Sequence, residues 1–383
     1  MKAARLLRYA IGASLVLAYG ASVHAQQTVT IGVAGPMTGG MAALGEDYAN
    51  GARLAIDEIN SGGLTIGGKK VILQLNVQDD AGDPRTATIV AQALVDQHVA
   101  AVIGHMNSGA TIPASKIYSD AGITQVSASS SPTYTLQGFR TTFRVAATDA
   151  QQGPVLAGYV ANRLHAKKVA ILDDATTYGQ GLADQFEKAA KADGVTVVSR
   201  DATSDKAVDF RSILTKIKGE NPDVIMFGGA YSQAGPIAKQ AGQLGIRAKI
   251  VGGDGICTES LAGLAGEAVN NVACSEVGLP LDRMPGGKTF EEKYVKRFGH
   301  PIEAYAPYAY DSVYVIVDAM KRAGSTDAAA ILAAVPATNY HGVIGDISFD
   351  KHGDLSRGTI SMFRYVNGKK AFMTETALAA SSE

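Results

Sequence analysis

A strand, a polar turn and a helix follow one another in the stretch Val102-Ile103-Gly104-His105-Met106-Asn107-Ser108-Gly109-Ala110-Thr111. We predict an apolar strand over 99–103 and a helix over about 111–121. Asn107 and Ser108 stand where a helix N-cap would stand, next to free backbone N–H groups at the positive end of the helix dipole. Such a turn can hold a small anion, for example a carboxylate. It can equally serve only to cap the helix.

A second turn of this kind follows about twenty residues later, at Ser127-Ala128-Ser129-Ser130-Ser131-Pro132. It also comes directly after a predicted strand. Two serine-rich turns at the ends of neighbouring strands can converge on one carboxylate, with Ala128, Ser129 and Ser130 at the centre of the second turn. We therefore favour a binding site over simple helix capping, and expect the ligand to be a small zwitterion.

Length and composition bound the class of protein. The chain has 383 residues, which favours two domains over a single core. With 46% apolar and 19% charged residues the composition is that of a globular protein. The formal net charge of −1 argues against nucleic acid as a partner, because nucleic-acid binders usually carry a basic face.

The first 25 residues have the pattern of an export signal. Lys2, Arg5 and Arg8 precede an apolar stretch over 10–18, and Val23-His24-Ala25 resembles a cleavage site. We expect cleavage near Ala25 and a mature chain that is secreted into a bacterial periplasm. No cysteine stands directly at the cleavage point and no other segment is apolar enough to cross a membrane, so we expect no membrane anchor.

Two cysteines remain, Cys257 and Cys274. An even pair in an oxidising compartment favours a disulfide, and the alternative is two buried reduced thiols. A bridge would stabilise the fold by roughly 3 kcal/mol in the chain-entropy model.

Strands and helices alternate along most of the mature chain, from a strand at 29–33 to a strand at 249–251. Strands separated by helices of ten to fifteen residues predict parallel sheets covered by helices on both faces. We therefore predict an α/β protein with two doubly wound, Rossmann-like parallel-sheet lobes. Ligands of such sheets bind beyond the carboxyl ends of the strands. The region after 277 is less regular, and residues 377–383 look like a frayed tail.

Other candidate site residues also follow predicted strands or begin helices. Asp254 lies between two glycines and can pair with an ammonium group, or can simply bond its own backbone in a turn. Tyr178, Tyr231 and Tyr305 offer apolar area and one hydroxyl each, and each can equally be a packing residue. Met106 can line an apolar pocket or belong to the core.

Enzyme signatures are mostly absent from the sequence. There is no phosphate-binding glycine loop and no nucleophile elbow. No two of the seven histidines have the helical spacing of metal ligands. We expect no catalytic activity, no cofactor and no metal.

Several short motifs are spread over the mature chain, among them Gly35-Pro36-Met37-Thr38-Gly39, Gln78-Asp79-Asp80, Ile103-Gly104-His105, Gln152-Gly153-Pro154 and Tyr178-Gly179-Gln180-Gly181. With these motifs the chain resembles the periplasmic leucine/isoleucine/valine-binding proteins that deliver substrate to branched-chain amino acid ABC importers. The resemblance implies a type I periplasmic binding protein fold, with two lobes joined by three hinge crossings. It places the first lobe at 28–146 plus 276–356, and the second at 147–275 plus 357–376.

The resemblance also implies roles for residues. Ser108 and the turn at 128–130 would bind the carboxylate and amine of an amino acid, Tyr178 would come from the second lobe, and Asp254 would pair with the ammonium. The family often has glutamate in place of Asp254. Two of its aromatic positions fall on Leu44 and Ala230.

The function that the resemblance implies is capture of an aliphatic or branched-chain amino acid by a monomeric receptor. The receptor would then deliver the ligand to the membrane permease of an ABC importer. A receptor or sensor module for another small carboxylate, amide or aromatic ligand is the alternative, and an exported enzyme is a more distant one.

Overall fold

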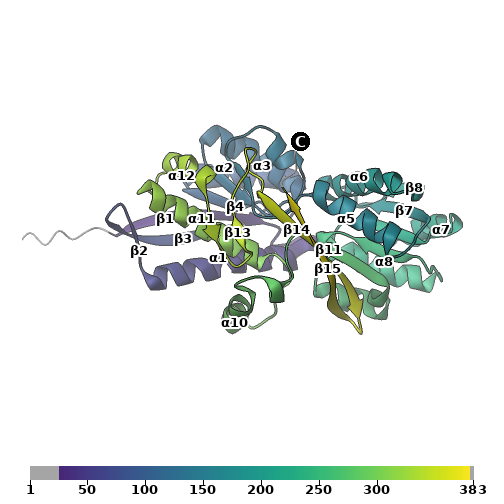
Figure 1. The fold of residues 1–383 in the computed structure, drawn as a ribbon. Helices are drawn as coiled ribbons and strands as arrows, with labels where there is room; N and C mark the ends of the chain where they lie inside the picture. Colours follow the sequence, from purple (N-terminus) through teal and green to yellow (C-terminus); the bar gives the residue numbers. More distant parts are fainter. Residues whose placement is uncertain (1–25, 380–383) are drawn as a thin grey trace, which may run out of the picture.

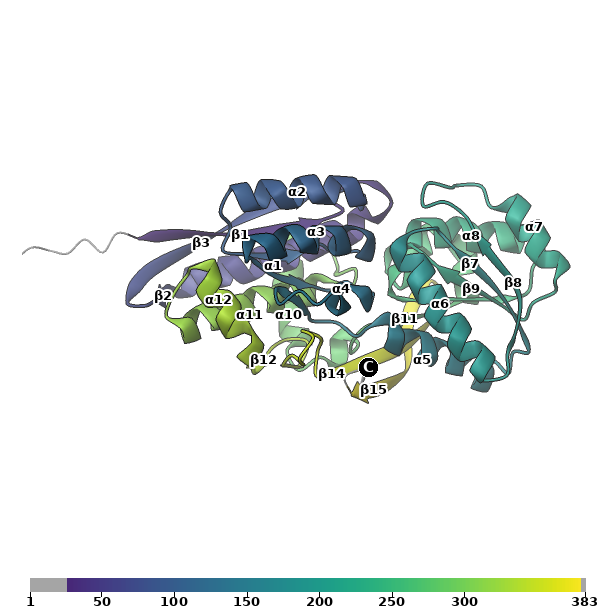
Figure 2. The ribbon, with the colours of Figure 1, turned by 90° about the horizontal axis from the view of Figure 1, so that it is seen from above.

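The computed structural model describes residues 26–379, so the expected export signal lies outside the described part of the chain. The chain forms two lobes that lie side by side, each built on its own sheet (Figures 1 and 2). Helices lie on both faces of each sheet, as the alternating pattern predicts.

The first sheet has six strands, which in spatial order are β2 (Leu64–Ile66), β3 (Lys69–Asp79), β1 (Gln27–Gly35), β4 (Ala101–Gly104), β5 (Thr124–Ser127) and β6 (Thr142–Arg144). All neighbours pair in parallel except β2 and β3. Gly67 and Gly68 make that hairpin turn with φ of 55° and 79°, a backbone conformation that favours glycine.

The second sheet has seven strands, which in spatial order are β15 (Lys369–Ala379), β14 (Arg357–Val366), β11 (Val272–Glu276), β10 (Lys249–Gly252), β9 (Val224–Gly228), β7 (Lys168–Asp173) and β8 (Thr196–Ala202). The strands from β7 to β11 are parallel, and β14 and β15 are antiparallel additions at one edge. The short strands β12 (Tyr340–His341) and β13 (Asp346–Ile347) form a separate pair.

The helices of the first lobe are α1 (Ala42–Gly62), α2 (Pro84–Asp96), α3 (Ser108–Ala121), α4 (Thr133–Leu136), α10 (Gly287–Phe298), α11 (Ala306–Ala323) and α12 (Ala328–Ala334). Those of the second lobe are α5 (Asp149–Asn162), α6 (Thr177–Ala192), α7 (Arg211–Gly219), α8 (Tyr231–Gln243) and α9 (Ser260–Ala265). Helix α11 follows the second lobe in the sequence but packs on α1 of the first lobe. The chain therefore returns to the first lobe before it ends.

Three segments connect the two lobes: 145–148 between β6 and α5, 277–280 after β11, and 348–356 before β14. In Figure 2 these segments lie together along one side of the junction between the lobes. This agrees with the three hinge crossings that the family resemblance implies.

Two expectations about element ends were wrong. Helix α3 begins at Ser108 and not at about Thr111, and the side chain of its N-cap residue Asn107 makes no capping hydrogen bond. The Asn107 amide instead donates to the carbonyl of Gly82, 3.3 Å away. Residues 377–379, expected to be frayed, continue β15 and pair with 357–359 of β14, because the antiparallel neighbour satisfies their backbone groups.

Candidate ligand-binding site

A cavity lies between the lobes, at the carboxyl ends of strands from both sheets. It encloses about 770 Å³ of space, its open mouth included. The predicted site residues that line it are Met106, Asn107, Ser108, Ala128, Ser129, Ser130, Tyr178, Asp254 and Tyr305. The structure therefore brings together residues that are up to 199 positions apart in the sequence, as expected for the switch region of doubly wound sheets.

The two serine turns meet on the first-lobe side of this cavity. The Ser129 hydroxyl donates a hydrogen bond to the Ser108 hydroxyl, 3.1 Å away. The hydroxyls of Thr111 and Ser127 both donate to the carbonyl oxygen of His105, at 2.8 and 2.6 Å, which ties the turn after β4 to the turn after β5. Ser108 is also the first residue of α3, so the positive end of that helix faces the same place. This arrangement suits a carboxylate.

A buried network that the sequence did not reveal supports the first serine turn. His105 Nδ1 lies 2.6 Å from Asp80 Oδ2, and His105 Nε2 lies 3.0 Å from the Tyr118 hydroxyl. None of the three side chains is exposed. They join the loop after β3, the turn after β4 and the body of α3, and so hold the backbone next to Ser108 in one position.

Arg144 supports the second serine turn in a similar way. Its guanidinium donates to the carbonyls of Ser129 and Ser131, and its Nε donates to Asp354 Oδ1 at 2.7 Å. The side chain is fully buried, so the charge depends on these acceptors. No motif in the sequence indicated this role, because Arg144 and Asp354 are 210 positions apart.

Asp254 is one of the acidic residues of the second lobe that line the cavity, and three side chains donate hydrogen bonds to its carboxylate. The Tyr178 hydroxyl and the Gln152 side-chain amide each donate a hydrogen bond of 2.9 Å to Asp254 Oδ1. Tyr305 of the first lobe donates to Asp254 Oδ2. The Tyr178 hydroxyl in turn accepts from the backbone N–H of Gly255 at 2.9 Å. Only 5% of Asp254 is exposed, so its carboxylate is held in place and largely shielded from solvent. Such a carboxylate can form a strong ion pair with an ammonium group.

The glycines on either side of Asp254 are required by close packing. A Cβ at Gly253 would lie 2.2 Å from Gln152 Oε1, and a Cβ at Gly255 would lie 2.6 Å from the carbonyl oxygen of Gly229. Larger residues would push the Asp254 turn away from Gln152 and Tyr178. The Gly-Asp-Gly sequence therefore lets the carboxylate reach its partners.

A second buried carboxylate, Asp149, was not expected. It is the first residue of α5, it is not exposed, and neither of its oxygens has a partner with standard hydrogen-bond geometry within 26–379. Burial raises the pKa of Asp149 to about 8, and the nearby Asp254 carboxylate adds to the rise, while the Ser130 side chain and Arg144 oppose it. Asp149 is thus a proton-binding group directly behind the amine side of the cavity.

Tyr231 is the predicted residue that the structure places elsewhere. It begins α8 and is 8% exposed, but it is not part of the cavity lining. Its hydroxyl interacts with the backbone of Ala43 in the first lobe, and burial raises the pKa of the phenol. The neighbouring Ala230 lines the cavity instead. Tyr231 points across the junction because the turn before α8 directs the first helical side chain towards the opposite lobe.

The remaining residues of the cavity lining differ in character between the two lobes. The first lobe contributes small and apolar residues, among them Met41, Leu44 and Gly82. The second lobe contributes polar ones: Asp174, Thr176, Asp205, Ser232 and Gln233. Sequence reasoning did not single out the polar residues, although Asp174 and Ser232 belong to turns that follow predicted strands.

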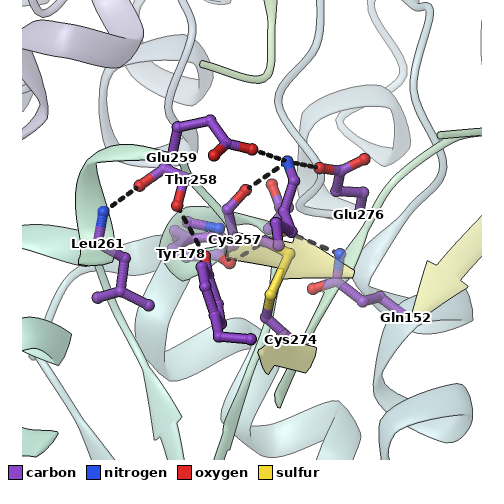
Figure 3. Close-up of a disulfide and its surroundings, with 12 residues drawn as sticks. Gln152, Tyr178, Cys257, Thr258, Glu259, Leu261, Cys274 and Glu276 are labelled. Carbon is purple, nitrogen blue, oxygen red and sulfur yellow. Dashed lines mark hydrogen bonds and ion pairs between the residues drawn. A yellow bond between two sulfur atoms is a disulfide. The ribbon is translucent and has the colours of Figure 1, made fainter. Parts of the chain in front are cut away.

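The predicted disulfide is present. Cys257 and Cys274 are bridged, with their Cα atoms 5.4 Å apart. Cys257 directly follows the 3-10 turn Asp254–Ile256, and Cys274 lies in β11. Figure 3 shows the bridge among Tyr178, Gln152 and Glu276, so the loop that carries Asp254 is covalently attached to the strand that leads into the hinge.

The sequence model of the periplasmic binding protein family matches residues 28–369. The chain belongs to this family. An amino acid binding protein of Pseudomonas aeruginosa is 39% identical over 88% of this chain and 90% of its own length. Leu/Ile/Val-binding protein homolog 1 of Brucella abortus is 34% identical over 94% of this chain and 95% of its own length.

Solved structures agree with the family assignment. The leucine-binding protein LivK of Thermotoga maritima has a TM-score of 0.84 and 29% identity, and the match covers 91% of this chain and 98% of that one. LivJ of Streptococcus pneumoniae, solved in complex with isoleucine, has a TM-score of 0.83 and 31% identity over 92% of this chain and 100% of that one. These relatives of the periplasmic binding protein are binding proteins of transport systems and not enzymes. Their fold is the two-lobe fold seen here.

Within the described residues, no helix is long and apolar enough to cross a membrane, and no group of histidine, cysteine and acidic side chains could hold a metal ion.

Proposed function

We propose that this periplasmic binding protein captures an aliphatic or branched-chain amino acid between its lobes and delivers it to the permease of an ABC importer. The observation that carries the proposal is the pairing of two opposite kinds of subsite in one cavity. Hydroxyl groups at the start of α3 suit a carboxylate, and the Asp254 carboxylate suits an ammonium group. The names of the relatives support the choice of ligand class.

The contacts between the lobes support a mechanism of capture by closure. Tyr305 of the first lobe bonds to Asp254 of the second, and the Tyr231 hydroxyl interacts with the Ala43 backbone. Both pairs form only when the lobes are close together. An amino acid that contacts both lobes would stabilise this closed form over an open one, because it binds the closed form more tightly. The permease would then recognise the closed receptor.

Further features belong to the same proposal. The boundaries 28–146 plus 276–356 and 147–275 plus 357–376 would delimit the two rigid bodies that close. The receptor would act as a monomer without catalysis, after export through a signal cleaved near Ala25. The closeness of the serine turns to Asp254 supports binding of a whole amino acid over binding of a simple carboxylate, because a simple carboxylate would leave Asp254 without a cationic partner.

Titration calorimetry with the twenty amino acids, small amides and aromatic acids tests the proposal. The protein should first be unfolded and refolded to remove any ligand acquired in the cell. We expect leucine, isoleucine or valine to bind with a stoichiometry of one, and small-angle X-ray scattering to show a more compact particle with ligand. Binding of aromatic acids alone would contradict the proposal, and turnover of a bound ligand would show an enzyme.

A further inference from the structure

The charged side chains that line the cavity are all acidic. They are Asp174, Asp205 and Asp254, and no lysine, arginine or histidine of the described chain contributes to the lining. A zwitterionic amino acid with an aliphatic side chain brings one cation, which Asp254 neutralises. The other two carboxylates would then have no cationic partner from the ligand or from the cavity wall.

Of the two remaining carboxylates, Asp174 and Asp205, Asp174 says more about the ligand because it is buried. It follows β7 directly and is 4% exposed. Its Oδ1 accepts from the backbone N–H of Thr176 at 3.0 Å and from the Thr176 hydroxyl at 2.6 Å. Its Oδ2 has no hydrogen-bond partner among residues 26–379. The turn thus accounts for one oxygen of Asp174 and leaves the other free at the cavity wall.

Burial and neighbouring acids both act on Asp174. Burial raises the pKa of this carboxyl to about 6, and the charges of Asp173 and Asp205 add to the rise. At neutral pH the Asp174 carboxyl is therefore ionised, and keeping this charge buried costs free energy. A hydrogen-bond donor that carries a positive charge would remove that cost, whereas an alkyl group placed against Oδ2 would increase it.

Asp174 and the Asp254 turn lie close to the same two glycines, Gly229 and Gly255, which pack against the rings of Phe227 and Tyr178. A Cβ at Gly229 would lie 2.9 Å from Asp174 Oδ2, and a Cβ at Gly255 would lie 2.6 Å from the Gly229 carbonyl oxygen. Gly229 therefore lies between Asp174 and the turn that holds Asp254. The cavity lining includes both Asp254 and Asp174, so a ligand side chain that starts at the ammonium subsite can reach Asp174 through the cavity itself.

The opposite wall suits the alkyl part of such a side chain. Met41 and Leu44 of the first lobe line it together with Gly82, next to Asn107. The Oδ1 atom of Asn107 is buried without a hydrogen-bond partner, and so is the Ser232 hydroxyl from the second lobe. These two unpartnered oxygens line the same cavity as Asp174.

We propose that the cavity also takes amino acids whose side chains end in a cation, such as arginine, ornithine and lysine, with the cation at Asp174. This inference rests on the proposed function, because it assumes that the α-carboxylate and α-ammonium groups occupy the serine turns and the Asp254 subsite. It adds a specificity-determining residue to that site. Asp205, which is exposed at the mouth of the cavity, adds a weaker attraction.

Arginine and citrulline are the matched ligands for the test, because they differ in the charged guanidinium and the neutral urea at the same end of the same chain. We expect refolded protein to bind arginine at least about tenfold more tightly than citrulline, as a hydrogen bond to a charged group predicts. Asp174→Asn keeps the Oδ1 acceptor for Thr176 and should reduce that ratio to about twofold or less.

Asp120→Asn is the matched control, because it removes one negative charge from an exposed residue near the far end of α3 and should leave the ratio unchanged. If Asp174→Asn fails to fold, Asp205→Asn should still lower the ratio, by about twofold. Leucine binding without measurable arginine binding, an arginine-to-citrulline ratio near one, or a ratio unaffected by Asp174→Asn would each overturn the inference while leaving the proposed function intact. Failure of every amino acid to bind would overturn both.

Discussion

Tyr305 at the start of α11 and Asp254 after β10 form a hydrogen bond between the two lobes, with the phenol hydroxyl as donor to Asp254 Oδ2. The two residues are 51 positions apart and belong to different lobes: Tyr305 caps a helix of the first lobe, and Asp254 begins a 3-10 turn of the second. The acidic group that we assign to the ligand's ammonium is therefore also a group that holds the lobes together. Ligand binding and lobe closure are thereby coupled through one carboxylate.

The first prediction concerns this bond. Tyr305→Phe should weaken amino acid binding by about 1.5–3 kcal/mol, because a hydrogen bond to a charged acceptor is lost and the closed form becomes less favourable. Calorimetry measures the affinity, and scattering measures the fraction of closed molecules. Tyr308→Phe is the matched control, because its ring centroid lies 6.1 Å from that of Tyr305 while its hydroxyl is not bonded to Asp254. An equal loss in both variants would exclude a specific role for the bond.

The second prediction concerns the charge of Asp254 itself. Asp254→Ala should abolish measurable binding of aliphatic amino acids, because the ligand's ammonium would then be buried without a counter-charge, a loss of about 2–5 kcal/mol or more. Calorimetry on the refolded variant checks this, and circular dichroism confirms that the fold persists. Unchanged affinity would reject the role that we assign to Asp254.

The third prediction concerns the carboxylate subsite. Ser130→Ala should weaken binding by about 1–3 kcal/mol through loss of one charge-assisted hydrogen bond. Ser131→Ala, in the same turn but outside the cavity lining, provides the comparison and should change the affinity little. A negligible effect of Ser130→Ala would remove this side chain from the site.

The fourth prediction follows from the pKa of Asp149, which burial raises to about 8 in the folded chain from the ordinary aspartate value of 3.8. Between these values the folded state binds the proton more tightly than the unfolded state does. The stabilising contribution is complete below pH 4 and is lost as the pH rises towards 8, with a slope of up to about 1.4 kcal/mol per pH unit.

Urea unfolding of the ligand-free protein between pH 5 and 8 measures this slope. Asp149→Asn should make it shallower and should raise the free energy of unfolding at pH 8, because the amide stays neutral. Burial also raises the pKa of Asp174 to about 6 and that of Asp311 to about 7. These two groups give the unfolding free energy a remaining dependence on pH in both the original protein and the variant. A variant that is less stable at pH 8 would contradict the assignment.

The fifth prediction concerns the disulfide. Cys257→Ser combined with Cys274→Ser should lower the free energy of unfolding by about 3 kcal/mol, as chain entropy predicts for a loop that the structure closes over a separation of 17 residues. Because Cys257 follows the turn that carries Asp254, we also expect weaker ligand binding. Unfolding of the oxidised protein with and without reductant gives an independent measurement, and equal stability in both would contradict the prediction.

Local sequence patterns predicted much of the architecture, because periodicity and turn residues act over short distances. The alternating strands and helices indicated parallel sheets, and the strand ends indicated the edge where Ser108, Ser129 and Asp254 meet. The sequence did not show that Tyr231 lies outside the cavity lining, because residues at a helix start can face the cavity or the other lobe, and only packing decides between them. It also missed β15, whose pairing partner is supplied by the antiparallel β14.

The sequence by itself determined the two-sheet fold and the set of turns from which the cavity is built, and it favoured a bridge between Cys257 and Cys274 over two reduced thiols. Only the tertiary structure decided what surrounds those turns: the His105–Asp80 and Arg144–Asp354 pairs, the buried and unpartnered carboxyl of Asp149, and the bonding of Asp174 through Oδ1 alone. The physical reason is that burial and hydrogen bonding depend on groups that are distant in sequence. Those groups meet only after both sheets have formed and the lobes have come together.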